Sequence, residues 1–134
     1  MLKQTILAID PGSHKCGLAV INGNAILDRA VVPVADLSGT IKTFQSKHLI
    51  DLVVIGSGTQ SQKVKNDLEN PELKLPTVFM PEKNTTLRAR ELYWKLNPPK
   101  GLWKLIPTSL RFPPVPVDDL AAVIIGREFL SSLK

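Results

Sequence analysis

The first third of the chain alternates short apolar runs with polar turns. Three runs suit β-strands, at 5–10, 17–21 and 25–33, and the third carries the β-branched pair Val31 and Val32. Between the second and third runs, Asn22-Gly23-Asn24 is a strong hairpin signal because Asn and Gly tolerate positive φ. The chain is therefore expected to open with three antiparallel strands.

The pattern changes period after the third strand. Helical spacing or a polar helix-forming sequence predicts four helices, at 37–49, 60–69, 87–96 and 117–133. Ser38 is the expected N-cap of the first helix. Apolar runs between the helices predict two more strands, at 51–56 and 77–80, and the first of these is rich in β-branched residues, as in a parallel strand buried on both faces. Strands followed by βα units predict an α/β fold with a mixed sheet and helices on both faces.

Composition bounds the class of protein. At 134 residues the chain is expected to form a single domain over 1–134. Its apolar runs fall short of the roughly 20 residues of a membrane helix, and the first run ends in Asp-Pro-Gly instead of a small-residue cleavage site. A single cysteine, Cys16, excludes an internal disulfide. We therefore expect a cytoplasmic protein without a membrane partner.

Charge points to a polyanionic partner. Seventeen Lys and Arg against 12 Asp and Glu give a net charge of +5, which favours nucleic acid. Residues 97–116 hold six of the 11 prolines and show no clear period. Trp103 and Arg111 in this segment suit base stacking and phosphate pairing. The alternative is that Trp103 and Phe112 fold back over the core.

Two carboxylates occupy positions that suit a metal ion. Asp10 ends the first predicted strand, and an aspartate at the edge of a sheet is a natural ligand for a hard divalent cation. Asp118 heads the stripe of the last helix that faces the sheet, while Asp119 is turned about 100° away by the helical repeat. The alternatives are an ordinary Asp-Pro-Gly turn and acidic residues at a helix N-terminus. The glycine-rich loop at 56–59 is a weak phosphate-binding signal, and a plain strand-to-helix connection is as good an interpretation.

The order of three motifs carries a family resemblance. IDPGS at 9–13 with GLAV at 17–20, EKNTT at 82–86 before a helix, and VDDLAA at 117–122 together resemble the YqgF family of pre-16S rRNA nucleases, relatives of the RuvC Holliday junction resolvases. The resemblance implies an RNase H-like mixed five-stranded sheet. It also implies that Asp10, Glu82 and Asp118 are both the catalytic residues and the metal ligands.

A function follows from this resemblance as an expectation. The chain would be a Mg²⁺-dependent endonuclease, with Mn²⁺ as an alternative cofactor, acting on phosphodiester bonds in pre-rRNA or in Holliday junction DNA. Ser13, Lys15 and Lys83 are expected to contact the substrate, together with Trp103 and Arg111. Both a monomer and a homodimer are compatible with the sequence.

Two other functions stay open at this point. Pro81 stands where the family often has Asp, and Lys83 replaces the usual Arg, which fits a catalytically inactive nucleic-acid-binding protein of the same fold. An ATPase of the sugar-kinase type has a similar first hairpin, but it needs a second, similar domain.

Overall fold

The computed structural model describes residues 4–57, 60–68, 75–81, 85–97 and 116–132. A five-stranded sheet lies at the centre, with the strand order β3-β2-β1-β4-β5. Its strands are β1 (Thr5–Asp10), β2 (Lys15–Asn22), β3 (Ala25–Pro33), β4 (Leu52–Ser57) and β5 (Thr77–Pro81). The first three strands pair antiparallel, whereas β1, β4 and β5 run parallel. The mixed sheet predicted from the sequence is confirmed.

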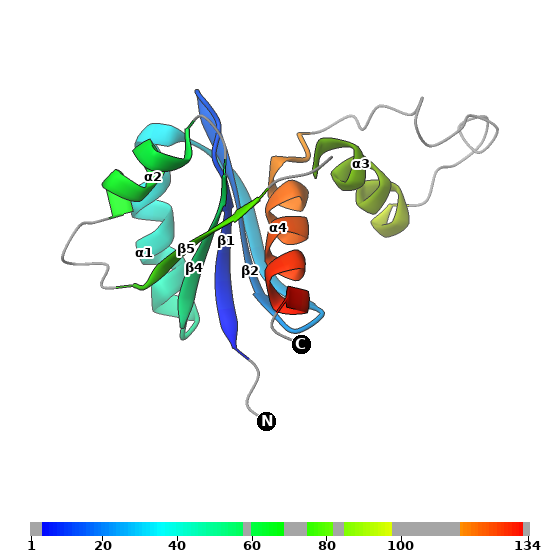
Figure 1. The fold of residues 1–134 in the computed structure, drawn as a ribbon, viewed down its shortest axis with the longest axis horizontal. Helices are drawn as coiled ribbons and strands as arrows, with labels where there is room; N and C mark the ends of the chain where they lie inside the picture. The colour runs from blue at the N-terminus through cyan, green and yellow to red at the C-terminus, as the bar shows by residue number, and fades with distance from the viewer. Residues whose placement is uncertain (1–3, 58–59, 69–74, 82–84, 98–115, 133–134) are drawn as a thin grey trace.

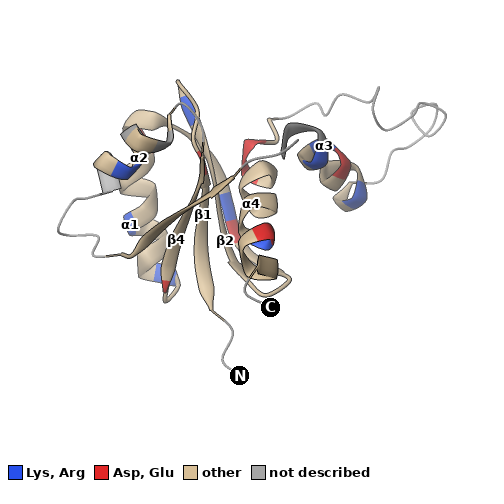
Figure 2. Cartoon of the chain, viewed as in Figure 1, with Lys and Arg blue, Asp and Glu red and all other residues tan. Residues whose placement is uncertain are grey.

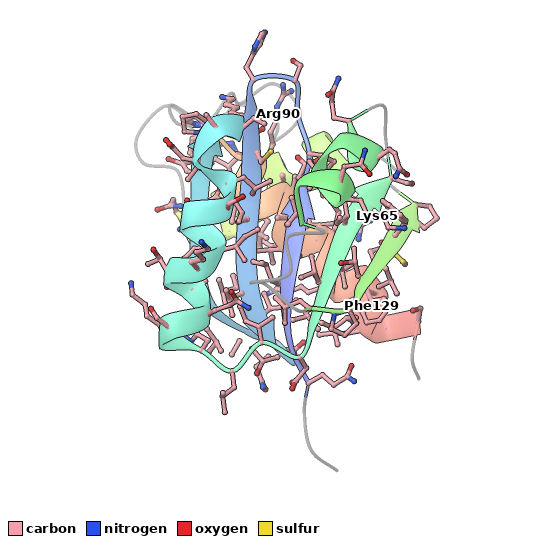
Figure 3. All side chains as sticks on the ribbon, turned by 90° about the vertical axis from the view of Figure 1, so that its left-hand side faces the viewer. Lys65, Arg90 and Phe129 are labelled. Carbon is pink, nitrogen blue, oxygen red and sulfur yellow. The ribbon has the colours of Figure 1, made fainter. Side chains whose placement is uncertain are left out.

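Helices cover both faces of this sheet (Figure 1). They are α1 (Leu37–Lys47), α2 (Ser61–Leu68), α3 (Thr85–Leu96) and α4 (Asp118–Ser132). Helices α1 and α2 lie on one face, and α4 lies on the other with α3 beside it. Figure 3 views the same layers from the side of α1 and α2, with α4 behind the sheet. The predicted layer order, helix on sheet on helix, is therefore correct.

The predicted N-cap of the first helix is wrong. A short 3-10 turn, Val34–Asp36, leads directly into α1, so Ser38 lies inside the helix. Asp36 occupies the N-cap position without a side-chain capping hydrogen bond, and the Leu37 N–H donates to the carbonyl of Val34 instead. The backbone of the preceding turn thus does what a capping side chain would do.

Alternate residues of the central strand enter two separate cores. Leu7 and Ile9 pack with α1 on one face, and Ile6 and Ala8 pack with α4 on the other. All four side chains are fully buried. Because successive strand residues point to opposite faces, an unbroken apolar run is what a strand covered on both sides requires. Strand β1 therefore fixes both helical layers relative to its own C-terminal residue, Asp10.

The predicted turn between β2 and β3 is confirmed at Gly23, whose φ is 59°.

Lys and Arg residues are spread over helices and strands of the described chain and are not gathered on one element (Figure 2). No helix in the described ranges is long and apolar enough to cross a membrane.

Candidate active site

The site begins at the C-terminal edge of the parallel strands. Strands β1, β4 and β5 share one direction, so their last residues, Asp10, Ser57 and Pro81, end at the same edge of the sheet. Helix α4 starts at this edge with Asp118, which lines the same pocket as Asp10. Ligands of open α/β sheets commonly bind at such an edge. The topology therefore brings together two acids that lie far apart in the sequence.

A glycine allows α4 to come this close. Gly17 pairs with Asp10 across the β1–β2 ladder. A Cβ atom at position 17 would lie 1.9 Å from the Asp118 carbonyl oxygen and 2.7 Å from the Asp119 nitrogen. Backbone atoms cannot yield as the end of a flexible side chain can. The absence of a side chain at Gly17 therefore sets the position of Asp118 relative to Asp10.

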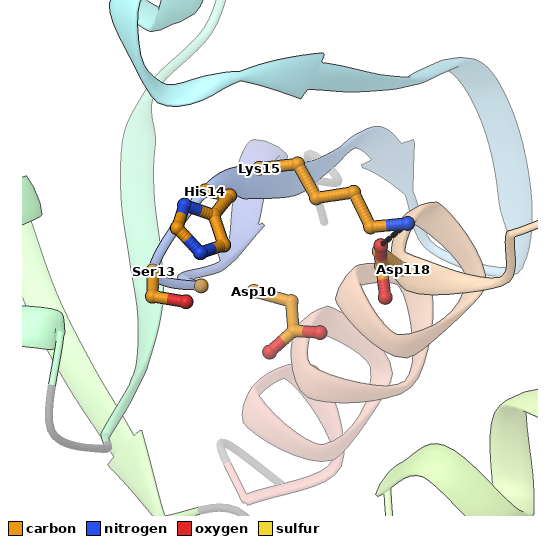
Figure 4. A pocket seen from close by; sticks show the side chains of 6 residues that line it. Asp10, Ser13, His14, Lys15 and Asp118 are labelled. Atoms are coloured by element: carbon orange, nitrogen blue, oxygen red, sulfur yellow. Dashed lines mark ion pairs between the residues drawn. The ribbon is translucent and has the colours of Figure 1, made fainter.

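The two carboxylates face an open pocket of about 250 Å³ (Figure 4). Its lining joins the end of β1, the β1–β2 turn and the start of α4, and it comprises Asp10, Gly12, Ser13, His14, Lys15 and Asp118. Four of the residues predicted for the site, Asp10, Ser13, Lys15 and Asp118, are thus brought together. The β1–β2 turn and the first residue of β2 supply a hydroxyl, an imidazole and an ammonium group to the rim of an acidic pocket.

One ion pair crosses this pocket. The Lys15 Nζ lies 3.4 Å from the Asp118 Oδ2, as the dashed line in Figure 4 marks. The exposed fractions of the two side chains are 53% and 34%. Within the described residues, the Asp118 Oδ2 is nevertheless a buried oxygen that accepts no hydrogen bond. The contact with Lys15 is therefore a charge pairing without hydrogen-bond geometry.

Asp119 does not turn away from the sheet as the helical repeat suggested. Its carboxylate pairs with the Arg29 Nε on β3 at 3.6 Å, and its side chain is only 17% exposed. Burial raises the pKa of Asp119, against the opposing effects of the Arg29 charge and of the hydrogen bond donated by the Leu120 N–H. Asp118 and Asp119 thus have different surroundings: the first lines the pocket, and the second ties the first turn of α4 to the sheet.

Four predicted site residues lie outside the described residues: Glu82, Lys83, Trp103 and Arg111. Phe112 and the Gly58-Thr59 part of the candidate phosphate loop lie outside them as well. Glu82 follows Pro81 directly in the chain, and Pro81 ends β5 at the same edge as Asp10. The predicted roles of these residues stay predictions.

Sequence reasoning missed His14, which lines the pocket from the β1–β2 turn. The available signal was its position in the sequence, directly between the predicted residues Ser13 and Lys15. The pairing of Asp119 with Arg29 had no such signal, because it depends on how α4 lies against β3.

The donor set suits a hard divalent cation. Asp10 and Asp118 offer carboxylate oxygens, which Mg²⁺ and Mn²⁺ prefer, and one of these oxygens is buried without a hydrogen bond in the described part of the chain. No group of three or more His, Cys, Asp or Glu side chains among the described residues is arranged to hold a metal. Mg²⁺ keeps several waters and needs few protein ligands, so two carboxylates fit it as part of a site.

Comparison with known proteins shows the fold. No family model matches the chain. Residues of the chain are 36% identical over 93 positions to the protein Tex of Bordetella pertussis, covering 59% of this chain and 12% of Tex. The solved structure of Thermus thermophilus RuvC with a Holliday junction substrate matches with a TM-score of 0.60 and 15% identity, covering 97% of this chain and 96% of that one. A second T. thermophilus RuvC structure matches with a TM-score of 0.59 and 13% identity over the same shares. The chain has the RuvC-type, RNase H-like fold.

Proposed function

We propose that this chain is a metal-dependent nuclease that hydrolyses phosphodiester bonds in structured nucleic acid. The observation that carries the proposal is the meeting of Asp10 and Asp118 in one open pocket at the C-terminal edge of the sheet. Carboxylates held together at that edge, with a rim of hydroxyl, imidazole and ammonium groups, suit a cation and a phosphate side by side. Structural acids at a turn and at a helix start have no need to share a pocket.

The roles of the residues follow from their chemistry. Asp10 and Asp118 would hold the divalent ion, with Glu82 as the third predicted ligand. When bound, such an ion lowers the pKa of a coordinated water and neutralises charge that develops on the phosphate. Ser13 can donate a hydrogen bond to a phosphate oxygen, and Lys15 can pair with its charge. The pocket is open to solvent, so a phosphate in a polymer can reach it.

The comparisons support a nucleic-acid substrate. The fold is that of RuvC, and one of the matching RuvC structures is a complex with a Holliday junction. The net charge of +5 agrees with a polyanionic partner. A cleavage assay distinguishes the two candidate substrates, a branched DNA and a precursor rRNA of the YqgF type.

The test is cleavage of two labelled substrates, a four-way DNA junction and a structured precursor rRNA, with Mg²⁺, Mn²⁺ or a chelator. We expect cleavage of one substrate that requires the metal. Asp10→Asn and Asp118→Asn should each lower the rate by about 100-fold or more, since even residues behind the metal ligands cost 10- to 100-fold. Asp36→Asn is the matched control, because Asp36 is exposed, lies at the start of α1 and makes no capping hydrogen bond.

Two results would overturn the proposal. Full activity in Asp10→Asn would show that this pocket is not the site of cleavage. Tight binding of both substrates without metal-dependent cleavage would instead favour the inactive nucleic-acid-binding protein considered from the sequence.

A further inference from the structure

A lysine ammonium lies at the rim of the acidic pocket and pairs with one of its two carboxylates. Lys15 is the first residue of β2 and follows the turn that closes β1 to β2. Its side chain reaches across the pocket towards the start of α4, where the Nζ comes within 3.4 Å of the Asp118 Oδ2 (Figure 4). A cation thus already lies beside the carboxylate that a metal ion would use.

The ion pair between Lys15 and Asp118 can break without a change in the backbone. The Lys15 side chain is 53% exposed, and its flexible four-carbon stem lets the ammonium move while the strand stays in place. The Asp118 Oδ2 is buried and accepts no hydrogen bond within the described chain. The ion pair therefore compensates the charge of Asp118 without fixing its geometry, and partly exposed pairs of this kind are weak.

We propose that Lys15 is the resident counter-ion of the metal pocket and exchanges its partner when the metal binds. With a divalent ion held by Asp118, the Lys15 ammonium would leave this carboxylate and would pair with a substrate phosphate at the rim. This inference rests on the proposed function and deepens it. It assigns Lys15 two successive partners in one pocket, where the sequence suggested only the phosphate.

Charge favours an exchange over simultaneous binding. An ammonium 3.4 Å from a carboxylate oxygen repels a dication that coordinates the same oxygen, since like charges at such separations repel strongly in a partly buried site. A phosphate bound at the rim would offer the ammonium a new partner, and Ser13 and His14 line the same pocket from the preceding turn. Lys15 should therefore oppose metal binding and favour substrate binding.

These opposite effects define the experiment. Lys15→Met removes the charge and keeps an apolar stem, and Lys42→Met on the exposed side of α1 lowers the net charge equally, away from the pocket. Mn²⁺ affinity is measured by titration calorimetry, and nucleic-acid affinity is measured by fluorescence anisotropy with Ca²⁺ in place of Mg²⁺. We expect Lys15→Met to bind Mn²⁺ about two- to fivefold more tightly than the wild type, as fits the loss of a partly exposed ion pair. Its nucleic-acid affinity should fall, with a salt slope shallower by about 0.9 on duplex DNA. Lys42→Met should leave Mn²⁺ affinity unchanged.

A structural role for Lys15 would give a different result. If Lys15→Met weakens both metal and nucleic-acid binding, Lys15 only holds the pocket together and the inference is overturned. Unchanged or weaker Mn²⁺ binding in Lys15→Met overturns it too. Lys15→Gln, which keeps a polar head without charge, repeats the test if the Met variant does not fold. The proposed function fails separately, when Asp10→Asn and Asp118→Asn bind Mn²⁺ as tightly as the wild type.

Discussion

Gly17 lies so close to the start of α4 that a Cβ atom there would be 1.9 Å from the Asp118 carbonyl oxygen. Gly17 is also the ladder partner of Asp10. One missing side chain therefore sets how near the two pocket carboxylates come to each other. The packing of α4 on the sheet and the geometry of the pocket depend on the same contact.

Gly17→Ala should push the first turn of α4 off the sheet. The neighbouring atoms are backbone, so the clash cannot be relieved by a rotamer change, and we expect the free energy of unfolding to fall by about 1–3 kcal/mol. Metal-dependent cleavage should fall by more than the loss of folded protein explains, because Asp118 moves away from Asp10. Urea unfolding and a rate assay on the folded protein measure the two effects.

The matched control for this substitution is Gly39→Ala. Gly39 lies within α1, and a Cβ atom there meets nothing within 4 Å. Gly39 lies in the first turn of α1, so alanine there should stabilise the protein by less than the roughly 1 kcal/mol of a helix interior, and it should leave cleavage unchanged. Equal losses from both substitutions would show that the contact at Gly17 has no special role.

The sequence predicted the fold well because each element carries its own local signal. The unbroken apolar run of β1 matches its burial on both faces, and Asn22-Gly23-Asn24 forms the predicted hairpin. Asp10 and Asp118 meet in one pocket because parallel strands and the N-terminus of α4 share one edge. That convergence follows from topology, which the order of the motifs already implied.

What the sequence could not predict depends on contacts between distant segments. Asp119 was expected to turn away from the sheet, but Arg29 on β3 lies within 3.6 Å of it. The helical repeat gives the direction of a side chain around its own helix. The contacts of that side chain depend on the position of the neighbouring strand. The Lys15–Asp118 pair is of the same kind. Both contacts join residues about 90 or more positions apart in the sequence.

The raised pKa of Asp119 predicts a pH dependence of stability. Burial favours the protonated carboxyl in the folded state, so the folded chain holds this proton to a higher pH than the unfolded chain, whose pKa is close to 3.8. Between these two pKa values the folded state binds more protons, and stability falls as pH rises. Asp119→Asn cannot ionise, so wild-type stability relative to this variant should fall above about pH 4 and then level off.

Urea unfolding of both proteins in a chelating buffer, from about pH 3.5 to 7, measures this difference. Titration of the groups that do not interact with Asp119 is common to both proteins and cancels. A wild-type stability that rises relative to the variant over this range would mean that Arg29 and the Leu120 N–H outweigh burial.

The Arg29–Asp119 pair should be coupled in stability. Arg29→Met leaves the partly buried Asp119 carboxylate without its cationic partner, which should cost more than removing both charges. In a double-mutant cycle, the double variant Arg29→Met with Asp119→Asn should therefore be more stable than Arg29→Met alone at neutral pH. Additive free energies of unfolding would contradict the pairing.

Divalent metal should stabilise the folded protein through the pocket. A ligand that binds only the folded state adds RT ln(1 + [L]/Kd), or about 2.7 kcal/mol at a concentration of 100 times Kd. Mn²⁺ should therefore raise the Tm of the wild type and of Asp36→Asn, and it should have little effect on Asp10→Asn and Asp118→Asn, which lose a ligand oxygen. Scanning calorimetry with Mn²⁺ and with a chelator gives the comparison. Lys15→Met should show a larger rise than the wild type at low Mn²⁺, because its pocket lacks the competing ammonium. An equal rise in all five proteins would place the metal elsewhere on the molecule.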